Sequence, residues 1–179
     1  DAGGRVFMSH WQDVWLEGST SDTSNGVQKP AIWSDIAQFD DLGAAPGDPA
    51  IDTIDEANNP KGASFATWML DPGVAGSSSR DQIVVHSARA SAKSIDNTKA
   101  ERWVNLISSS SIQPQMFQFS TPNELPEEQR CGKVVFSDMH VSGDAGFGDY
   151  PANCGPTPTM SAQEKALAFM FFDIASCVG

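Results

Sequence analysis

The chain has 179 residues, 40% of them hydrophobic, which is enough for one domain with a core and too few for two. Eleven Lys and Arg against 23 Asp and Glu give a net charge of -12, which argues against nucleic acid or anionic lipid as a partner. No apolar run reaches the roughly 20 residues that a membrane span needs. We therefore expect one domain over residues 1–179 with no membrane span.

The first predicted elements are a strand and a short helix. Arg5–Ser9 is an apolar run after two glycines, a pattern typical of a buried strand. In residues 11–18 the apolar side chains are spaced to bury one face of a short helix, which Gly18 ends. The sequence before this strand reads as a turn with no leader, so we expect the chain to be cut from a longer protein. Abundant serine, scarce lysine and three late cysteines favour export.

Residues 19–62 are predicted to form a long irregular acidic loop. They contain four prolines and a cluster of acidic side chains between Asp40 and Glu56, so little regular structure is expected. The acidic cluster suggests a calcium site in this loop, but its spacing does not follow the D-x-[DN]-x-[DN]-G pattern of calcium loops. A solvated acidic loop without metal is the alternative that the sequence favours.

The middle of the chain alternates between the two kinds of regular structure. Ala63–Leu70 has apolar side chains at helical spacing before an Asp-Pro-Gly break, and Gln82–His86 is β-branched and apolar, as a core strand should be. An apolar stripe predicts another helix at Thr98–Ile107. This alternation predicts a layered α/β fold.

The last third predicts a β-hairpin followed by a helix. The strands Gln115–Ser120 and Lys133–His140 are joined by a proline-rich polar connection, which makes a hairpin with a long loop. Residues 161–164 then spell the S-x-x-E capping box that starts a helix. Apolar side chains surround this helix, so we expect it to be buried on most sides. Truncating Phe171 or Phe172 to alanine should then cost about 3 to 5 kcal/mol.

The three cysteines predict a disulfide. If the Lys133–His140 strand rises through the sheet, Cys131 lies at its start and the terminal helix carries Cys177 back to the same level. A disulfide needs Cα atoms within about 7 Å. The terminal helix of about 16 residues separates Cys154 from Cys177 by on the order of 24 Å. We therefore predict a Cys131–Cys177 disulfide, with Cys154 free or paired outside this chain.

Each histidine follows a predicted strand, and this is where chemistry could occur. Ligands of open α/β sheets bind beyond the carboxyl ends of the strands. His10 and His140 could meet there as an acid/base pair oriented by Asp13 or Asp138. The alternative is that His10, His86 and His140 are strand-end histidines satisfied by the backbone or by aromatic neighbours. A zinc site from His10, His140 and one carboxylate fits the ligand types but is the weaker interpretation.

Three tryptophans around His10 leave a further alternative open. Trp11, Trp15 and Trp33 could line a sugar-binding cleft, because broad aromatic faces suit carbohydrate. On a helix face they could equally pack in the core, which is the interpretation that the spacing favours. The sequence has no serine-hydrolase elbow, zincin or nucleotide-binding motif, so none of these activities has positive support.

The segments GGRVFMSHW and CGKVVFSDMH together resemble the trehalose-utilisation (ThuA-like) group of the class I glutamine amidotransferase-like fold. In that group a glycine-led strand ends in a histidine at the nucleophile position, here His10. A later strand with an antiparallel partner also ends in a histidine, here His140. The resemblance implies a flavodoxin-like, amidotransferase-like layered sheet that is incomplete at its N-terminal end. It also implies no amidotransferase activity, since no cysteine stands near position 10.

Two functions from different classes follow. The first is a binding or assembly module of an exported bacterial surface or extracellular protein, with a degenerate amidotransferase-like fold. Its partner would be another chain or segment that supplies the missing part of the sheet. The second is a hydrolase that acts on a saccharide or a related small substrate through the pair His10 and His140.

Overall fold

The computed structural model describes residues 3–17, 29, 31–33, 35–39, 47–107, 112–139 and 160–175. The helices are α1 Val14–Glu17, α2 Gly62–Leu70 and α3 Ala162–Ala175, with short 3-10 turns at His10–Gln12, Ala31–Trp33 and Glu127–Gln129. The strands are β1 Arg5–Ser9, β2 Ala37–Phe39, β3 Ala50–Ile54, β4 Gln82–Val85, β5 Ala92–Ile95, β6 Glu101–Ile107, β7 Ile112–Thr121 and β8 Gly132–Ser137. The fold is therefore mixed α/β, as the sequence predicted.

Six of these strands form one mixed sheet in the order β1-β8-β7-β6-β3-β4. β1 pairs in parallel with β8, and every other neighbouring pair in this sheet is antiparallel. It follows that β1, β8, β6 and β4 all run in one direction, while β7 and β3 run in the other. Strands β2 and β5 form a separate antiparallel pair.

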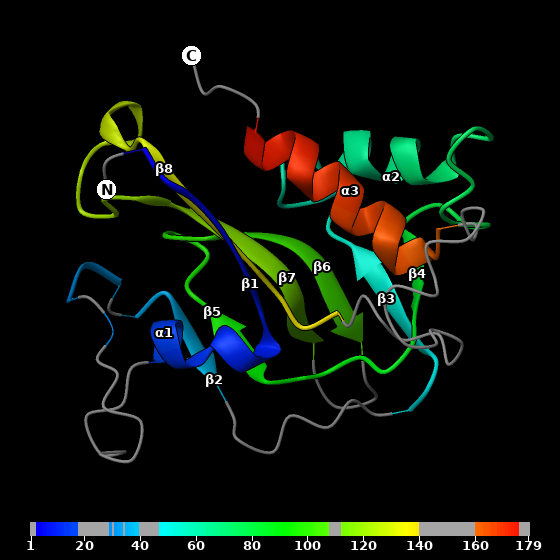
Figure 1. The fold of residues 1–179 in the computed structure, drawn as a ribbon, viewed down its shortest axis with the longest axis horizontal. Coiled ribbons are helices and arrows are strands. Elements are labelled where there is room, and N and C mark those ends of the chain that lie inside the picture. The colour runs from blue at the N-terminus through cyan, green and yellow to red at the C-terminus, as the bar shows by residue number, and fades with distance from the viewer. Residues whose placement is uncertain are drawn as a thin grey trace, which may run out of the picture.

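Two cores lie on opposite faces of the six-stranded sheet. Helices α2 and α3 cover one face, where Phe65, Trp103 and Met170 are fully buried. On the other face α1 and the β2–β5 pair enclose a smaller core around Phe117 and Phe136. Figure 1 shows the two helices above the sheet and α1, β2 and β5 below it. Among the described helices, none is long and apolar enough to cross a membrane.

The predicted hairpin and the terminal helix are confirmed. β7 and β8 pair antiparallel, with Phe119 opposite Val134, and the Glu127–Gln129 turn lies in the long connection between them. The capping box at the start of α3 is also formed. The Ser161 N–H donates to Glu164 Oε2 at 2.7 Å, and the Glu164 N–H donates to Ser161 Oγ at 3.2 Å.

The predicted helix at Thr98–Ile107 is wrong, because residues 101–107 form strand β6 between β3 and β7. Irregular pairing with β7, between Arg102 and Val104 and between Val104 and Asn105, breaks the alternation of the strand. The adjacent residues Trp103 and Val104 are both buried in the same core, so the pattern mimics a helical stripe. Residues 19–62 also contain more regular structure than expected. β2 and β3 lie there, and in β3 the alternate residues Ala50, Asp52 and Ile54 are buried.

The terminal helix is not buried on most sides. Phe171 is 49% exposed and Phe172 is 76% exposed, so the expected loss of 3 to 5 kcal/mol on truncating either of them is wrong. The side of α3 that meets the sheet carries the small or flexible residues Ala166 and Met170 instead. Although α3 is apolar on most sides, only the side that faces the sheet is buried by it.

Candidate functional site

Strands β1, β8, β6 and β4 run in the same direction, so their carboxyl ends lie along one edge of the sheet. Ser9 of β1 pairs with Ser137 of β8, so the residues that follow, His10 and Asp138, leave the sheet side by side at this edge. His86 follows β4, which lies at the opposite end of the strand order. Five strand spacings of about 4.8 Å put β4 on the order of 24 Å from β1. The structure therefore brings His10 and Asp138 to one place and keeps His86 apart, while His140 lies outside the described residues.

A short helical segment after β1 places His10, Trp11 and Trp15 at this edge. The Ser9 N–H and hydroxyl both donate to Gln12 Oε1, at 2.6 and 2.8 Å, and this fixes the turn. Buried Leu16 then anchors α1 against the core around Phe117 and Phe136.

Trp11 is 79% exposed and Trp15 is 51% exposed, so the interpretation of these two as core residues is wrong. The Trp11 ring lies 5.4 Å from the His10 ring, centroid to centroid. Core packing fits Trp33 instead, which is half-buried with its ring 5.4 Å from that of Phe119. Exposed aromatic rings beside a histidine make this edge a candidate ligand surface.

The Asp13 carboxylate accepts a hydrogen bond from the Val14 N–H at 2.7 Å, at the start of α1. This contact joins neighbouring residues at the N-terminal end of α1. The role of Asp13 in orienting a histidine stays a prediction.

Asp138 binds the segment that joins β4 to β5, residues 86–91, which we call the crossover segment. Its carboxylate accepts the Ser91 hydroxyl at 2.6 Å and the Ala92 N–H at 2.9 Å, and its main-chain oxygen accepts the Arg89 N–H at 3.0 Å. Gln115 bonds the same segment, because its side-chain amide donates to the Arg89 carbonyl. The Asp138 side chain is fully buried, and burial raises the pKa of its carboxyl in spite of these hydrogen bonds. Asp138 thus has a clear structural role, and its role in catalysis stays a prediction.

The other end of the crossover segment is also held by side chains. Gln163 of α3 accepts the His86 N–H and donates to the His86 carbonyl, both at 2.9 Å. Asp48 accepts the Ser87 N–H at 3.2 Å. Ser87 has a φ of 54°, a left-handed conformation that is unfavourable for serine, so these bonds also hold a strained residue.

Asp52 is the residue that sequence reasoning missed. It lies on the core-facing side of β3, its side chain is 0% exposed, and neither carboxylate oxygen has a hydrogen-bond partner in the described structure. Burial, with a smaller contribution from the charge of Asp138, raises the pKa of Asp52 from 3.8 to about 8. Asp52 therefore holds a proton at neutral pH. The strand-like alternation of Ala50–Ile54 was the signal that could have placed it in a core.

The described carboxylates of the predicted acidic loop do not converge on one point. Asp48 contacts the crossover segment, Asp52 is buried, Asp55 pairs with Arg102 at 2.9 Å, and Glu56 pairs with Arg80. Within the described ranges, no group of three or more His, Cys, Asp or Glu side chains is placed to hold a metal ion. A calcium site in this loop stays a prediction, because residues 40–46 lie outside those ranges.

The predicted disulfide also stays a prediction, because Cys177 and Cys154 lie outside the described residues. Cys131 is exposed, and the guanidinium of Arg5 donates both to the Cys131 carbonyl at 2.6 Å and to the Ile174 carbonyl at 2.8 Å. The end of α3 is therefore beside Cys131, as the proposed pairing requires.

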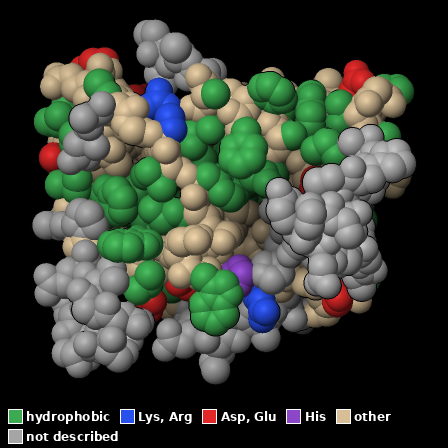
Figure 2. Space-filling model, in the orientation of Figure 1, with side chains coloured by type: hydrophobic (Ala, Val, Ile, Leu, Met, Phe, Trp, Pro, Cys, Tyr) green, Lys and Arg blue, Asp and Glu red, His purple; other side chains and the backbone are tan. Residues whose placement is uncertain are grey.

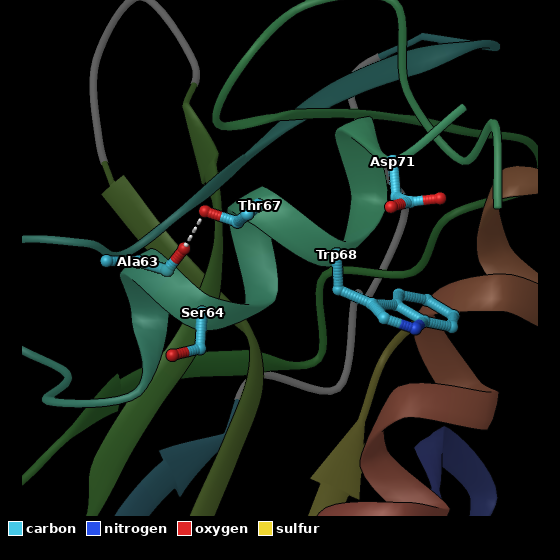
Figure 3. A pocket seen from close by; sticks show the side chains of 5 residues that line it. All are labelled: Ala63, Ser64, Thr67, Trp68 and Asp71. Atoms are coloured by element: carbon cyan, nitrogen blue, oxygen red, sulfur yellow. Dashed lines mark hydrogen bonds between the residues drawn. The ribbon is translucent and has the colours of Figure 1, made fainter. Parts of the chain in front are cut away.

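A hollow lies on the outer side of α2, lined by Ala63, Ser64, Thr67, Trp68 and Asp71 (Figure 3). Its polar groups are used locally: the Thr67 hydroxyl donates to the Ala63 carbonyl at 2.8 Å, and Asp71 accepts the Gly73 N–H at 2.7 Å. This hollow therefore offers no converging set of reactive groups.

Comparison of the chain with protein-family models, with curated proteins and with solved structures found no match. The likeness to the ThuA-like group thus stays a proposal. The features that bear on function are the open side of edge strand β1, the exposed rings of Trp11 and Trp15, and the buried carboxyl groups of Asp52 and Asp138.

Proposed function

We propose that this chain is a binding or assembly module of an exported bacterial surface or extracellular protein, built on a degenerate, flavodoxin-like amidotransferase-like sheet. The observation that carries this proposal is the open edge of β1. In the described structure β1 is paired only on its β8 side. Antiparallel β7 beside β8 is the arrangement that the resemblance implies for the later strand.

Apolar side chains flank this open edge. Val6 of β1 is 40% exposed, and Phe171 of α3, whose ring lies 5.4 Å from that of Phe7, is half exposed beside it. Figure 2 shows hydrophobic side chains gathered over α3 and beside β1 on the face in view. An edge strand presents unpaired N–H and C=O groups that can accept another strand, and the apolar flanks would be buried by it. The proposed partner is accordingly a strand from another chain or segment, which completes the sheet.

The two edges of the sheet provide a matched test of this proposal. A photo-reactive phenylalanine analogue at position 6 should crosslink to the partner in the exporting cell, while the same analogue at Val84, 42% exposed on the opposite edge strand β4, should not. Val6→Lys combined with a crosslinker at position 7 should lower the crosslinked yield several-fold, because a buried charge opposes docking. Equal crosslinking at both edges, or none at position 6, would contradict the proposal.

Saccharide binding is the second candidate, and the exposure of Trp11 and Trp15 favours it. Flat aromatic faces in solvent can stack on sugar rings, and these two lie at the edge where α/β sheets bind ligands. Because His10 lies beside Trp11, a saccharide hydrolase that uses His10 and His140 as its acid/base pair stays an alternative proposal. Saccharide binding and saccharide hydrolysis differ in one readout, because only a hydrolase releases new reducing ends.

For this candidate we expect tryptophan fluorescence to change on titration with soluble cello-, chito- or malto-oligosaccharides. Trp11→Ala and Trp15→Ala should each weaken binding about tenfold, the equivalent of about 1.4 kcal/mol. Phe172→Ala is the matched control, because it removes an exposed aromatic ring from α3. Equal losses in all three variants, or no fluorescence change with any of these sugars, would reject saccharide binding at this edge.

A further inference from the structure

The open side of β1 presents the main-chain groups of two residues to a partner. The Gly4 carbonyl accepts the Lys133 N–H at 3.0 Å, so it faces β8. Main-chain groups alternate in direction along a strand, so those of Val6 also face β8, whereas those of Arg5 and Phe7 face the open side. In the described structure no strand pairs with β1 on that side.

This open stretch is closed at both ends. Beyond Phe7, the Ser9 N–H is already taken by Gln12 Oε1 at 2.6 Å. Before Arg5, Gly3 has a φ of 89°, which turns the backbone out of the extended conformation. The edge therefore offers a short and defined stretch, with an N–H and a C=O from each of Arg5 and Phe7.

We propose that the partner strand is β1 of a second copy of this chain, so that two sheets join edge to edge about a two-fold axis. This inference rests on the proposed function and names its partner. If two antiparallel β1 strands meet with Val6 opposite its own counterpart, Arg5 of each copy is opposite Phe7 of the other. That register uses the N–H and C=O of both residues in both copies. The next pair would join Ser9 to Gly3, the two positions where the stretch is closed.

Other registers of the same antiparallel pair fit less well. A shift in one direction puts Arg5 opposite Arg5, where the two like charges repel each other. A shift in the other direction puts Arg5 opposite Ser9, whose N–H is taken by Gln12. The register centred on Val6 avoids both conflicts.

The side chains along this edge are complementary to those of a second copy. Arg5 of one copy would lie beside Phe7 of the other, a favourable pairing of a cation with an aromatic ring. β1 has no acidic residue, although the chain has a net charge of -12. Val6 is 40% exposed, and half-exposed Phe171 has its ring 5.4 Å from that of Phe7. Joining two copies would cover both of these apolar side chains.

The net charge of the chain makes a second copy distinguishable from other partners. Two copies with a net charge of -12 each repel at long range, and salt screens this repulsion. Association of two copies should therefore become tighter as the salt concentration rises. Binding of a basic partner would become weaker under the same change.

Val6→Cys tests the register. In a non-hydrogen-bonded antiparallel pair the Cα atoms are about 4.5 Å apart, which is within the range of a disulfide. Mild oxidation should therefore convert most of Val6→Cys into covalent dimers, with the link between the introduced thiols located by peptide mapping. Val84→Cys places a similarly exposed thiol on edge strand β4 and should give no more dimer than the natural protein. Equal yields of dimer from the two variants would overturn the proposal.

Sedimentation equilibrium tests the association without a new bond. The mass of the natural protein should rise from 19.1 kDa toward twice this value as its concentration approaches about 1 mM, and more steeply at high salt. Val6→Lys places two like charges opposite each other at the axis, so it should raise the dissociation constant at least about tenfold. Val84→Lys makes the same change of charge on β4 and should leave the dissociation constant unchanged.

The outcomes separate this inference from the proposed function. A natural protein that stays at 19.1 kDa at about 1 mM would overturn the second copy as the partner. If the photo-reactive analogue at position 6 then crosslinks to a different protein in the exporting cell, the proposed function stands with that protein as the partner. If it crosslinks to nothing, the proposed function fails as well.

Discussion

Asp138→Ala is expected to destabilise the protein by about 3 to 5 kcal/mol at pH 6. The substitution leaves the Ser91 hydroxyl and the Ala92 N–H as buried donors without an acceptor, and each such donor costs about 1 to 3 kcal/mol. It also releases the crossover segment at the point where it passes over the end of β8. Urea unfolding measures the loss directly.

Ser91→Ala is the control for this prediction. It removes one donor together with its hydrogen bond and leaves the Ala92 bond to Asp138 intact, so it should cost about 1 kcal/mol. A loss below about 1 kcal/mol in Asp138→Ala would show that the crossover segment is held without this carboxylate.

Phe65→Ala is expected to cost about 3 to 5 kcal/mol, whereas Phe172→Ala should change stability by less than about 1 kcal/mol. The Phe65 ring is fully buried, stacks on Phe169 at 4.6 Å and meets Trp103 edge-on at 5.9 Å. Phe172 projects into solvent from α3. Chemical denaturation of the two variants compares the same chemical change at a buried and an exposed site. Similar losses would mean that the exposed side of α3 is covered in solution.

The features of the fold that depend on local chemistry could be predicted from the sequence. The capping box of α3, the strand before His10 and the hairpin of β7 and β8 depend on residues close in the chain, and all three were found. β6 has a helix-like pattern because irregular pairing with β7 around Val104 interrupts the alternation that identifies a strand, and such pairing cannot be seen in the sequence. How far a terminal helix is buried likewise depends on which elements cover it. The apolar residues Phe171 and Phe172 do not reveal this in the sequence.

The candidate site shows the same limit. Asp138 could be placed at the end of a strand, but its partners Ser91 and Gln115 come from other segments and are brought to it only by the tertiary fold. The sequence places Asp52 among several acidic loop residues, because nothing in its immediate sequence marks a carboxyl that is buried without a donor. The exposure of Trp11 and Trp15 also depends on tertiary packing, because Leu16 is the residue of α1 that is buried in the core shared with β2 and β5.

The parallel pairing of β1 with β8 has a consequence for synthesis of the protein. Arg5 pairs with Lys133, so β1 leaves the ribosome well before the strand with which it pairs. Such long-range closure is slow, because the entropy of a large loop is lost before the contacts form. Until then the side of β1 that β8 will cover is open to other chains, and we expect this protein to depend on chaperones that shield β1 during biogenesis.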